Sequence, residues 1–127
     1  MSPLTVALIA LGGALGALTR FAITRALLPL ADRTRFPLAT LLVNLGGSAL
    51  LGALLTRAPS GEPLHHLPML ALGGLGFCGA LTTFSTFAVE TTRLAGTSRG
   101  RALIYVLATV LGAPLCLALA MSLAGRA

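Results

Sequence analysis

The chain has 127 residues, of which 56% are hydrophobic and only 9% are charged. Soluble domains carry about 25% charged residues, so this composition excludes an ordinary soluble domain, and it is far too apolar for a disordered chain. The formal net charge is +6, because nine arginines face three acidic residues. In a soluble protein this balance would suggest a nucleic-acid partner. Here the positions of the arginines indicate a membrane protein, and we expect no nucleic-acid partner.

The arginines lie between four long stretches that carry no charge. A helix needs about 20 mostly apolar residues to cross the hydrocarbon core of a bilayer. We expect the first helix to continue past Arg20 and Arg25, whose long side chains would extend toward the lipid headgroups. The sequence therefore predicts one all-α domain, residues 1–127, with four membrane-spanning helices at residues 4–28, 36–56, 67–91 and 102–124.

Three short polar segments join the predicted helices. Proline, glycine and charged residues mark them at Pro29 to Pro37, Pro59 to Pro68 and Gly96 to Arg101. None is long enough for a domain outside the membrane. His65 and His66 are adjacent, which is poor spacing for metal ligands on any regular element. Because the sequence also lacks a catalytic triad pattern and a phosphate-binding loop, we expect no enzyme activity.

Small residues recur at helical spacing within the predicted helices. Gly12 and Gly16 are four residues apart, as are Ser48 and Gly52. Small residues let helix backbones approach closely, which is how helices pack in lipid without a hydrophobic driving force. With 15 glycines in the chain, we expect a tight bundle. We also expect an oligomer, because four short helices alone enclose little space.

A polar stripe runs along the second predicted helix. Thr40, Asn44 and Ser48 are four residues apart and share one helix face. A carboxamide that faced lipid would leave its donors and its acceptor unsatisfied, so Asn44 must face protein, water or a ligand. Two roles fit this stripe. It is either a set of hydrogen bonds between helices, worth about 0.6–2 kcal/mol, or the lining of a polar path.

The third predicted helix carries a glycine-rich stretch followed by a run of hydroxyl residues. Four hydroxyl side chains fall within residues 82–86, directly after Gly76 and Gly79. Threonine and glycine are poor helix formers, so we expect a break near the middle of the membrane. Backbone groups freed there must be buried or line a site, and broken helices commonly build ion sites. Phe84 and Phe87 point in similar directions, which plain packing would also explain.

Three of these segments together resemble the Fluc (CrcB) family of fluoride channels, along almost the whole chain. Residues 12–20 resemble the family's glycine-rich first helix, which ends in arginine. Residues 37–48 follow its pattern Pro-x-x-Thr-Leu-x-x-Asn-x-x-Gly-Ser. Residues 76–79 and 82–87 match its most diagnostic run. Three motifs in the right order, at the right chain length, make the match specific.

The resemblance implies a fluoride-selective channel that exports fluoride passively across the plasma membrane and so relieves fluoride toxicity. Family members are antiparallel dimers with two pores and a sodium ion buried at the dimer centre. By analogy, the backbone carbonyls of Gly79 and Thr82 would hold the sodium ion.

The resemblance also implies roles for side chains. Phe84 and Phe87 would line the pore, with the amide of Asn44 beside them. The family's polar track is matched by Thr40, by Ser85 or Thr86, and by Thr109. Tyr105 matches the tyrosine of its last helix, Glu90 its acidic pore mouth and Arg20 the arginine of its first helix. The family often carries a second hydroxyl one turn beyond the first on its last helix. Ala113 stands at that position here.

These residue types suit fluoride. Fluoride is small and strongly hydrated, so a pore must replace the hydrogen bonds of its water shell, which amides and hydroxyls can do. The edge of an aromatic ring is electropositive and can face an anion without a fixed charge. A basic residue in mid-span would hold the anion too tightly, since conduction needs weak, multiple sites. The middles of the four predicted spans contain none.

The arginines are unevenly distributed between the two predicted membrane faces. The first and third loops, with the helix ends beside them, hold seven arginines, or five if Arg20 and Arg93 lie within helices; the opposite face holds Arg57 and Arg126. The positive-inside rule then predicts that both termini lie outside the cytoplasm. A chain that inserts in both orientations needs balanced charge. We therefore expect an antiparallel heterodimer with a paralogous subunit, with a dimer of identical chains as the alternative.

Three other functions are compatible with a small membrane protein of this size. A small multidrug transporter would need an acidic residue within a span, and Asp32, Glu62 and Glu90 all lie in loops or at a span end. A non-transporting membrane scaffold would leave Asn44 and the hydroxyl run without a purpose. A channel for another anion, such as chloride, would require a wider constriction with fewer hydrogen-bond donors.

Overall fold

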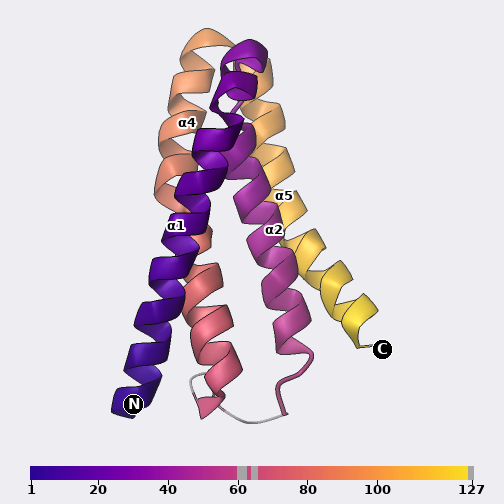
Figure 1. The fold of residues 1–127 in the computed structure, drawn as a ribbon. Coiled ribbons are helices and arrows are strands. Elements are labelled where there is room, and N and C mark those ends of the chain that lie inside the picture. The colour runs from indigo at the N-terminus through magenta and orange to yellow at the C-terminus, as the bar shows by residue number, and fades with distance from the viewer. Residues whose placement is uncertain (60–62, 64–65, 126–127) are drawn as a thin grey trace.

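The computed structural model describes residues 1–59, 63 and 66–125, and its regular secondary structure there is helical throughout. The helices form four stretches that are long and apolar enough to cross a membrane, which confirms the predicted fold class. Both chain ends lie at the same end of the bundle (Figure 1). The elements are α1 (Pro3–Thr34), α2 (Leu38–Leu55), η2 (Leu70–Cys78), α3 (Gly79–Leu81), α4 (Phe84–Thr97) and α5 (Arg99–Ala124). Glu62, His65 and Arg126, named above, lie outside the described residues.

α1 continues beyond Leu28, where the sequence suggested its end. Pro29 was assigned to the first loop, but it lies inside α1, which ends only at Thr34. Membrane helices tolerate an internal proline because neighbouring groups satisfy the backbone that it frees. The connection to α2 is short, and Arg35 turns the chain in the left-handed conformation, with φ 51° and ψ 41°.

The third loop is likewise shorter than expected. α4 ends at Thr97 and α5 begins at Arg99, so Ser98 alone links them. The Ser98 hydroxyl accepts a hydrogen bond from the backbone N–H of Arg101 at 3.4 Å. Ser98 thus caps α5 in the way that serine favours at a helix start. Most of residues 96–101 are therefore helical rather than loop.

α1 packs directly on the backbone of η2. Gly12 and Gly16 are the buried residues of α1. A Cβ atom at Gly12 would collide with the carbonyl oxygen of Leu72, and one at Gly16 with that of Phe77. This is the close approach that small residues allow in lipid. η2 itself is a nine-residue π-helix, a rare conformation that nothing in the sequence indicated.

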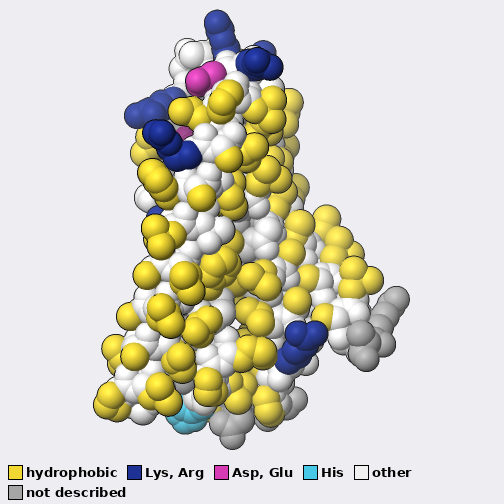
Figure 2. Space-filling model, in the orientation of Figure 1, with side chains coloured by type: hydrophobic (Ala, Val, Ile, Leu, Met, Phe, Trp, Pro, Cys, Tyr) yellow, Lys and Arg dark blue, Asp and Glu magenta, His cyan; other side chains and the backbone are white. Residues whose placement is uncertain are grey.

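The outer surface of the bundle matches a membrane environment. Large apolar side chains remain exposed along the helices, such as Leu18 at 63% and Leu111 at 62%. Arginines gather at one end of the molecule, and the face below them is mainly hydrophobic (Figure 2). At the arginine-rich end, Phe87, Leu94 and Tyr105 form a buried cluster between α4 and α5.

We predict that Gly12→Ala destabilises the bundle, whereas Gly13→Ala does not. The added methyl group at position 12 meets backbone of η2, while a Cβ at Gly13 has nothing within 4 Å. Overpacking of this kind costs about 1–3 kcal/mol. Thermal unfolding of the purified chain in detergent would measure the difference, and equal melting temperatures for the two variants would contradict the close contact.

Candidate ion-conduction site

The third membrane-spanning stretch is broken at Thr82 and Thr83. α3 ends at Leu81, both threonines are extended, with φ −75° and −151°, and α4 begins at Phe84. The Thr83 hydroxyl caps α4 by accepting a hydrogen bond from the backbone N–H of Thr86 at 3.3 Å. The break lies near the middle of the stretch Leu70–Thr97, as the glycine and hydroxyl pattern predicted.

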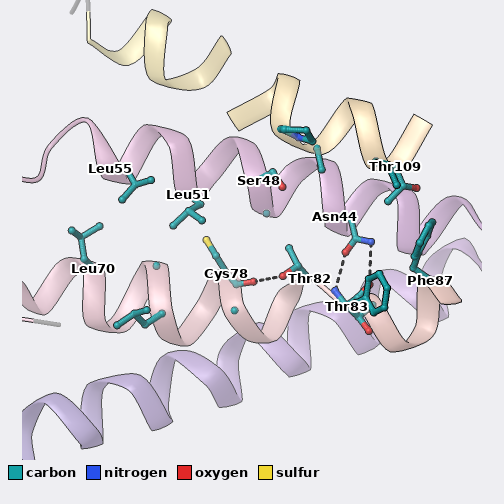
Figure 3. A pocket seen from close by; sticks show the side chains of 18 residues that line it. Asn44, Ser48, Leu51, Leu55, Leu70, Cys78, Thr82, Thr83, Phe87 and Thr109 are labelled. Atoms are coloured by element: carbon teal, nitrogen blue, oxygen red, sulfur yellow. Dashed lines mark hydrogen bonds between the residues drawn. The ribbon is translucent and has the colours of Figure 1, made fainter. Parts of the chain in front are cut away.

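Asn44 of α2 closes this break with two hydrogen bonds. Its Oδ1 accepts from the backbone N–H of Thr83 at 2.8 Å, and its Nδ2 donates to the carbonyl of Thr83 at 3.2 Å (Figure 3). Asn44 is only 7% exposed. The carboxamide therefore replaces the helical partner that the Thr83 N–H has lost, and it adds a second donor to the Thr83 carbonyl, which as the cap of α4 also accepts the first bond of that helix. Of the two roles that the polar stripe allowed, the structure shows the bond between helices.

The same interaction changes which carbonyls are paired around the break. In a continuous helix the N–H of Thr83 would bond to the carbonyl of Gly79, but here it bonds to Asn44. The neighbouring carbonyl of Thr82 accepts from Nη1 of Arg20 at 3.5 Å. We expected Arg20 to extend toward the headgroups. Instead it reaches inward from α1, because the break offers its guanidinium a backbone acceptor within the bundle.

A groove of about 670 Å³ lies beside the break, between α2, the third stretch and α5. Its polar end is formed by Asn44, Thr82, Thr83 and Thr109, and its other end by leucines (Figure 3). The Thr109 hydroxyl donates to the carbonyl of Tyr105 at 2.9 Å, so its proton is engaged within its own helix. Gly79, Phe84 and Phe87 also line the groove, as does Ala113, so the hydroxyl track ends at Thr109 on this wall.

Four aromatic rings form a continuous row from the groove toward the arginine-rich end. The centroids of Phe84 and Phe87 are 5.8 Å apart, and those of Phe87 and Tyr105 are 5.3 Å apart. Phe36 meets Tyr105 edge-on at 5.7 Å and 84°. Phe87 is buried, but Phe84 is 79% exposed. The sequence did not indicate the contact between Phe36 and Tyr105, because the two residues lie far apart in the chain.

Tyr105 connects the row to a carboxylate. It has no exposed surface, and its hydroxyl donates to Oε2 of Glu90 at 2.8 Å. The Thr40 hydroxyl is a further hydrogen-bond partner of Tyr105. Glu90 also lines a second cavity of about 700 Å³ at the arginine-rich end. Tyr105 therefore touches both Phe87 of the groove and Glu90 of that cavity.

The first turn of α4 presents a cluster of hydroxyl groups. Thr83 Oγ1 donates to Thr86 Oγ1 at 3.1 Å and lies 3.3 Å from Ser85 Oγ. Because Thr86 accepts this bond, its own proton remains free to donate, and its side chain is exposed. The positive end of the α4 dipole lies here as well. Thr83 has this capping role although it was not among the residues predicted for the site, and threonine before a helical turn is a favoured cap.

The structure thus divides the residues named from the sequence into separate groups. Asn44, Thr82, Phe84, Phe87 and Thr109 share the groove, with Gly79. Thr40, Tyr105 and Glu90 form the hydrogen-bonded group at its edge, while Ser85 and Thr86 lie on the α4 turn. Among the described residues, no cluster of three His, Cys, Asp or Glu side chains could hold a metal ion.

Comparison with known proteins identifies the family. The family described as CrcB-like protein, Camphor Resistance (CrcB), matches residues 7–122. The chain belongs to this family. The chain is 46% identical over 110 residues to "Fluoride-specific ion channel FluC 1" of Nocardia farcinica, covering 83% of this chain and 72% of the relative. It is 48% identical over 109 residues to "Fluoride-specific ion channel FluC 2" of Rhodococcus jostii, covering 84% and 87%.

A third relative is more distant in identity. The chain is 41% identical over 108 residues to "Fluoride-specific ion channel FluC" of Thermotoga maritima, covering 85% of this chain and 84% of the relative. With its four spanning helices, this CrcB-like chain is a multi-pass membrane protein.

We predict that Asn44→Ala destabilises the chain more than Ser48→Ala, its neighbour one turn along the same face. The alanine leaves the buried N–H of Thr83 without its partner and removes one donor to the Thr83 carbonyl, and an unsatisfied buried group costs about 1–3 kcal/mol. Melting temperatures in detergent would measure this, with circular dichroism to follow helix content. Similar stability of the two variants would mean that water or another group replaces the carboxamide.

Proposed function

We propose that this chain is a fluoride-selective ion channel that exports fluoride passively across the plasma membrane and so relieves fluoride toxicity. The relatives named fluoride-specific ion channel support this function. The observation that carries it is the broken helix held by Asn44, next to a groove with an aromatic pair and a helix N-terminus. Such a site offers hydrogen-bond donors to an anion.

The pore would use two kinds of donor. The free hydroxyl proton of Thr86 and the backbone N–H groups of Phe84 and Ser85 would replace part of the water shell of fluoride, whereas the N–H of Thr86 already donates to Thr83. The ring edges of Phe84 and Phe87 add an electropositive surface that binds only weakly. Weak, successive sites let the ion leave as readily as it binds. The Thr109 hydroxyl would have to turn away from the carbonyl of Tyr105 before it could donate to the ion.

One chain presents only half of such a pathway. Phe84 is 79% exposed, and the groove it lines is open on one side. A second subunit packed in the antiparallel orientation would cover this side and enclose the ion path. Two equivalent paths would then lie at the subunit interface.

A structural sodium ion fits the carbonyls at the break. Sodium prefers oxygen ligands, and the Gly79 carbonyl has lost its helical partner to Asn44. The carbonyl of Thr82 would be the second ligand, although Arg20 contacts it at 3.5 Å in the single chain. The ion would add positive potential beside the pore without entering it.

The distribution of arginines favours one orientation in the membrane. Arg33, Arg35 and Arg101 lie at the end where the first and third connections meet, and Arg57 follows α2 at the other end. The arginine-rich end would face the cytoplasm. An antiparallel partner must then insert the opposite way, which favours a paralogous subunit of reversed charge bias over a second copy.

Fluoride efflux from liposomes tests the function directly. We expect vesicles that contain the purified chain, alone or with its partner subunit, to lose fluoride but retain chloride, as read with ion-selective electrodes. Loss of both ions would indicate a less selective anion channel. No loss with the partner present would contradict the channel function and favour a scaffold.

The Phe84→Ile substitution tests whether the electropositive ring edge contributes to conduction. Phe84 is largely exposed, so its replacement removes little packing, whereas Phe87→Ile also removes contacts with Tyr105. We expect Phe84→Ile to reduce fluoride efflux at least about tenfold, equivalent to about 1.4 kcal/mol, with unchanged elution in gel filtration. Unchanged flux would remove this ring from the mechanism.

A reporter at either terminus tests the orientation. We expect a compartment-sensitive fusion at the N-terminus or the C-terminus to report only the side opposite the cytoplasm. Equal signal from both sides would show dual insertion and would favour a dimer of identical chains.

A further inference from the structure

The cavity at the arginine-rich end has a charge pattern that the groove beside the helix break lacks. Arginines from three separate segments line it: Arg35 from the turn after α1, Arg93 from α4 and Arg101 from α5. Asp32 and Glu90 line the same cavity of about 700 Å³. Three guanidinium groups and two carboxylates leave one net positive charge, and Figure 2 shows basic side chains gathered at this end.

These guanidinium groups have few partners in the protein. Among the described residues, the guanidinium groups of Arg35 and Arg93 make no hydrogen bond or ion pair. The guanidinium group of Arg101 donates only to the carbonyl of Thr34, at 3.5 Å. Glu90 accepts instead from Tyr105. The guanidinium groups that line the cavity are therefore not in direct contact with the carboxylates that line it.

A phosphate group matches this arrangement. Guanidinium groups bind phosphate oxygens through paired, charge-assisted hydrogen bonds, and they do so from several directions at once. The net charge of the lining equals that of one phosphodiester in magnitude. The cavity also lies at a helix end, where basic pockets between membrane helices meet anionic headgroups. Fluoride is a single atom, so it would not need three guanidinium groups arranged around it.

We propose that this cavity binds a phosphate group through Arg35, Arg93 and Arg101. Its source is either the headgroup of an anionic phospholipid in the adjoining leaflet or inorganic phosphate from solution. The site is distinct from the groove beside the helix break, because the two have no lining residue in common. The inference does not depend on fluoride conduction, so either can fail without the other.

Binding to the purified full chain tests the site. Equilibrium dialysis in a neutral detergent would measure the affinity for radiolabelled inorganic phosphate. Native mass spectrometry would compare retained phosphatidylglycerol with phosphatidylcholine. The test variant is Arg35→Gln combined with Arg93→Gln. The matched control is Arg33→Gln combined with Arg99→Gln, which removes the same charge from exposed arginines of the same end that do not line the cavity.

We expect the test variant to bind the phosphate compound at least about tenfold more weakly, and the control within about twofold of the original chain. Selective retention of phosphatidylglycerol would identify the lipid as the source, and phosphate binding without lipid would identify the free ion. No selective binding of either compound by the original chain would overturn the proposal. Equal weakening in both double variants would do so too, because it would indicate only a general effect of charge.

Discussion

The pairing of Asn44 with the backbone of Thr83 is the constraint on which the rest of this structure depends. Two extended residues in the middle of a membrane interrupt the helical hydrogen bonds, and the N–H of Thr83 would face a solvent that offers no partner. The buried carboxamide accepts from this N–H at 2.8 Å and donates to the Thr83 carbonyl at 3.2 Å. Without it, the N–H of Thr83 would have no partner at this depth, and the polar end of the groove would lose one of its four members.

The break separates backbone charge in a way that no side chain could at this depth. Carbonyls at the end of α3 present partial negative charge, and amides at the start of α4 present partial positive charge. The guanidinium group of Arg20 contacts the Thr82 carbonyl at this break, at 3.5 Å. The row of aromatic rings begins at the start of α4, on the positive side of the break, and continues through Phe87 to Tyr105.

Patterns that act over short sequence distances could be predicted. The uncharged stretches indicated four membrane helices, and the glycines before the threonines of 82–86 indicated the break. The spacing of Gly12 and Gly16 indicated a close helix contact. Contacts set by the tertiary arrangement could not be derived in this way. The sequence indicated that Asn44 needs a partner but not that the partner is Thr83. It also predicted that Arg20 extends toward the headgroups. This prediction was wrong because the acceptor at Thr82 is present only when α1 packs beside the break.

The exposed first turn of α4 bears on the stability of a chain that has no partner subunit. Ser85 and Thr86 present hydroxyls outward at the depth of the break, and a lone chain would hold them against hydrocarbon at a free-energy penalty. The partner subunit proposed above would cover this turn and remove the penalty, so the folded population would rise with partner concentration by mass action.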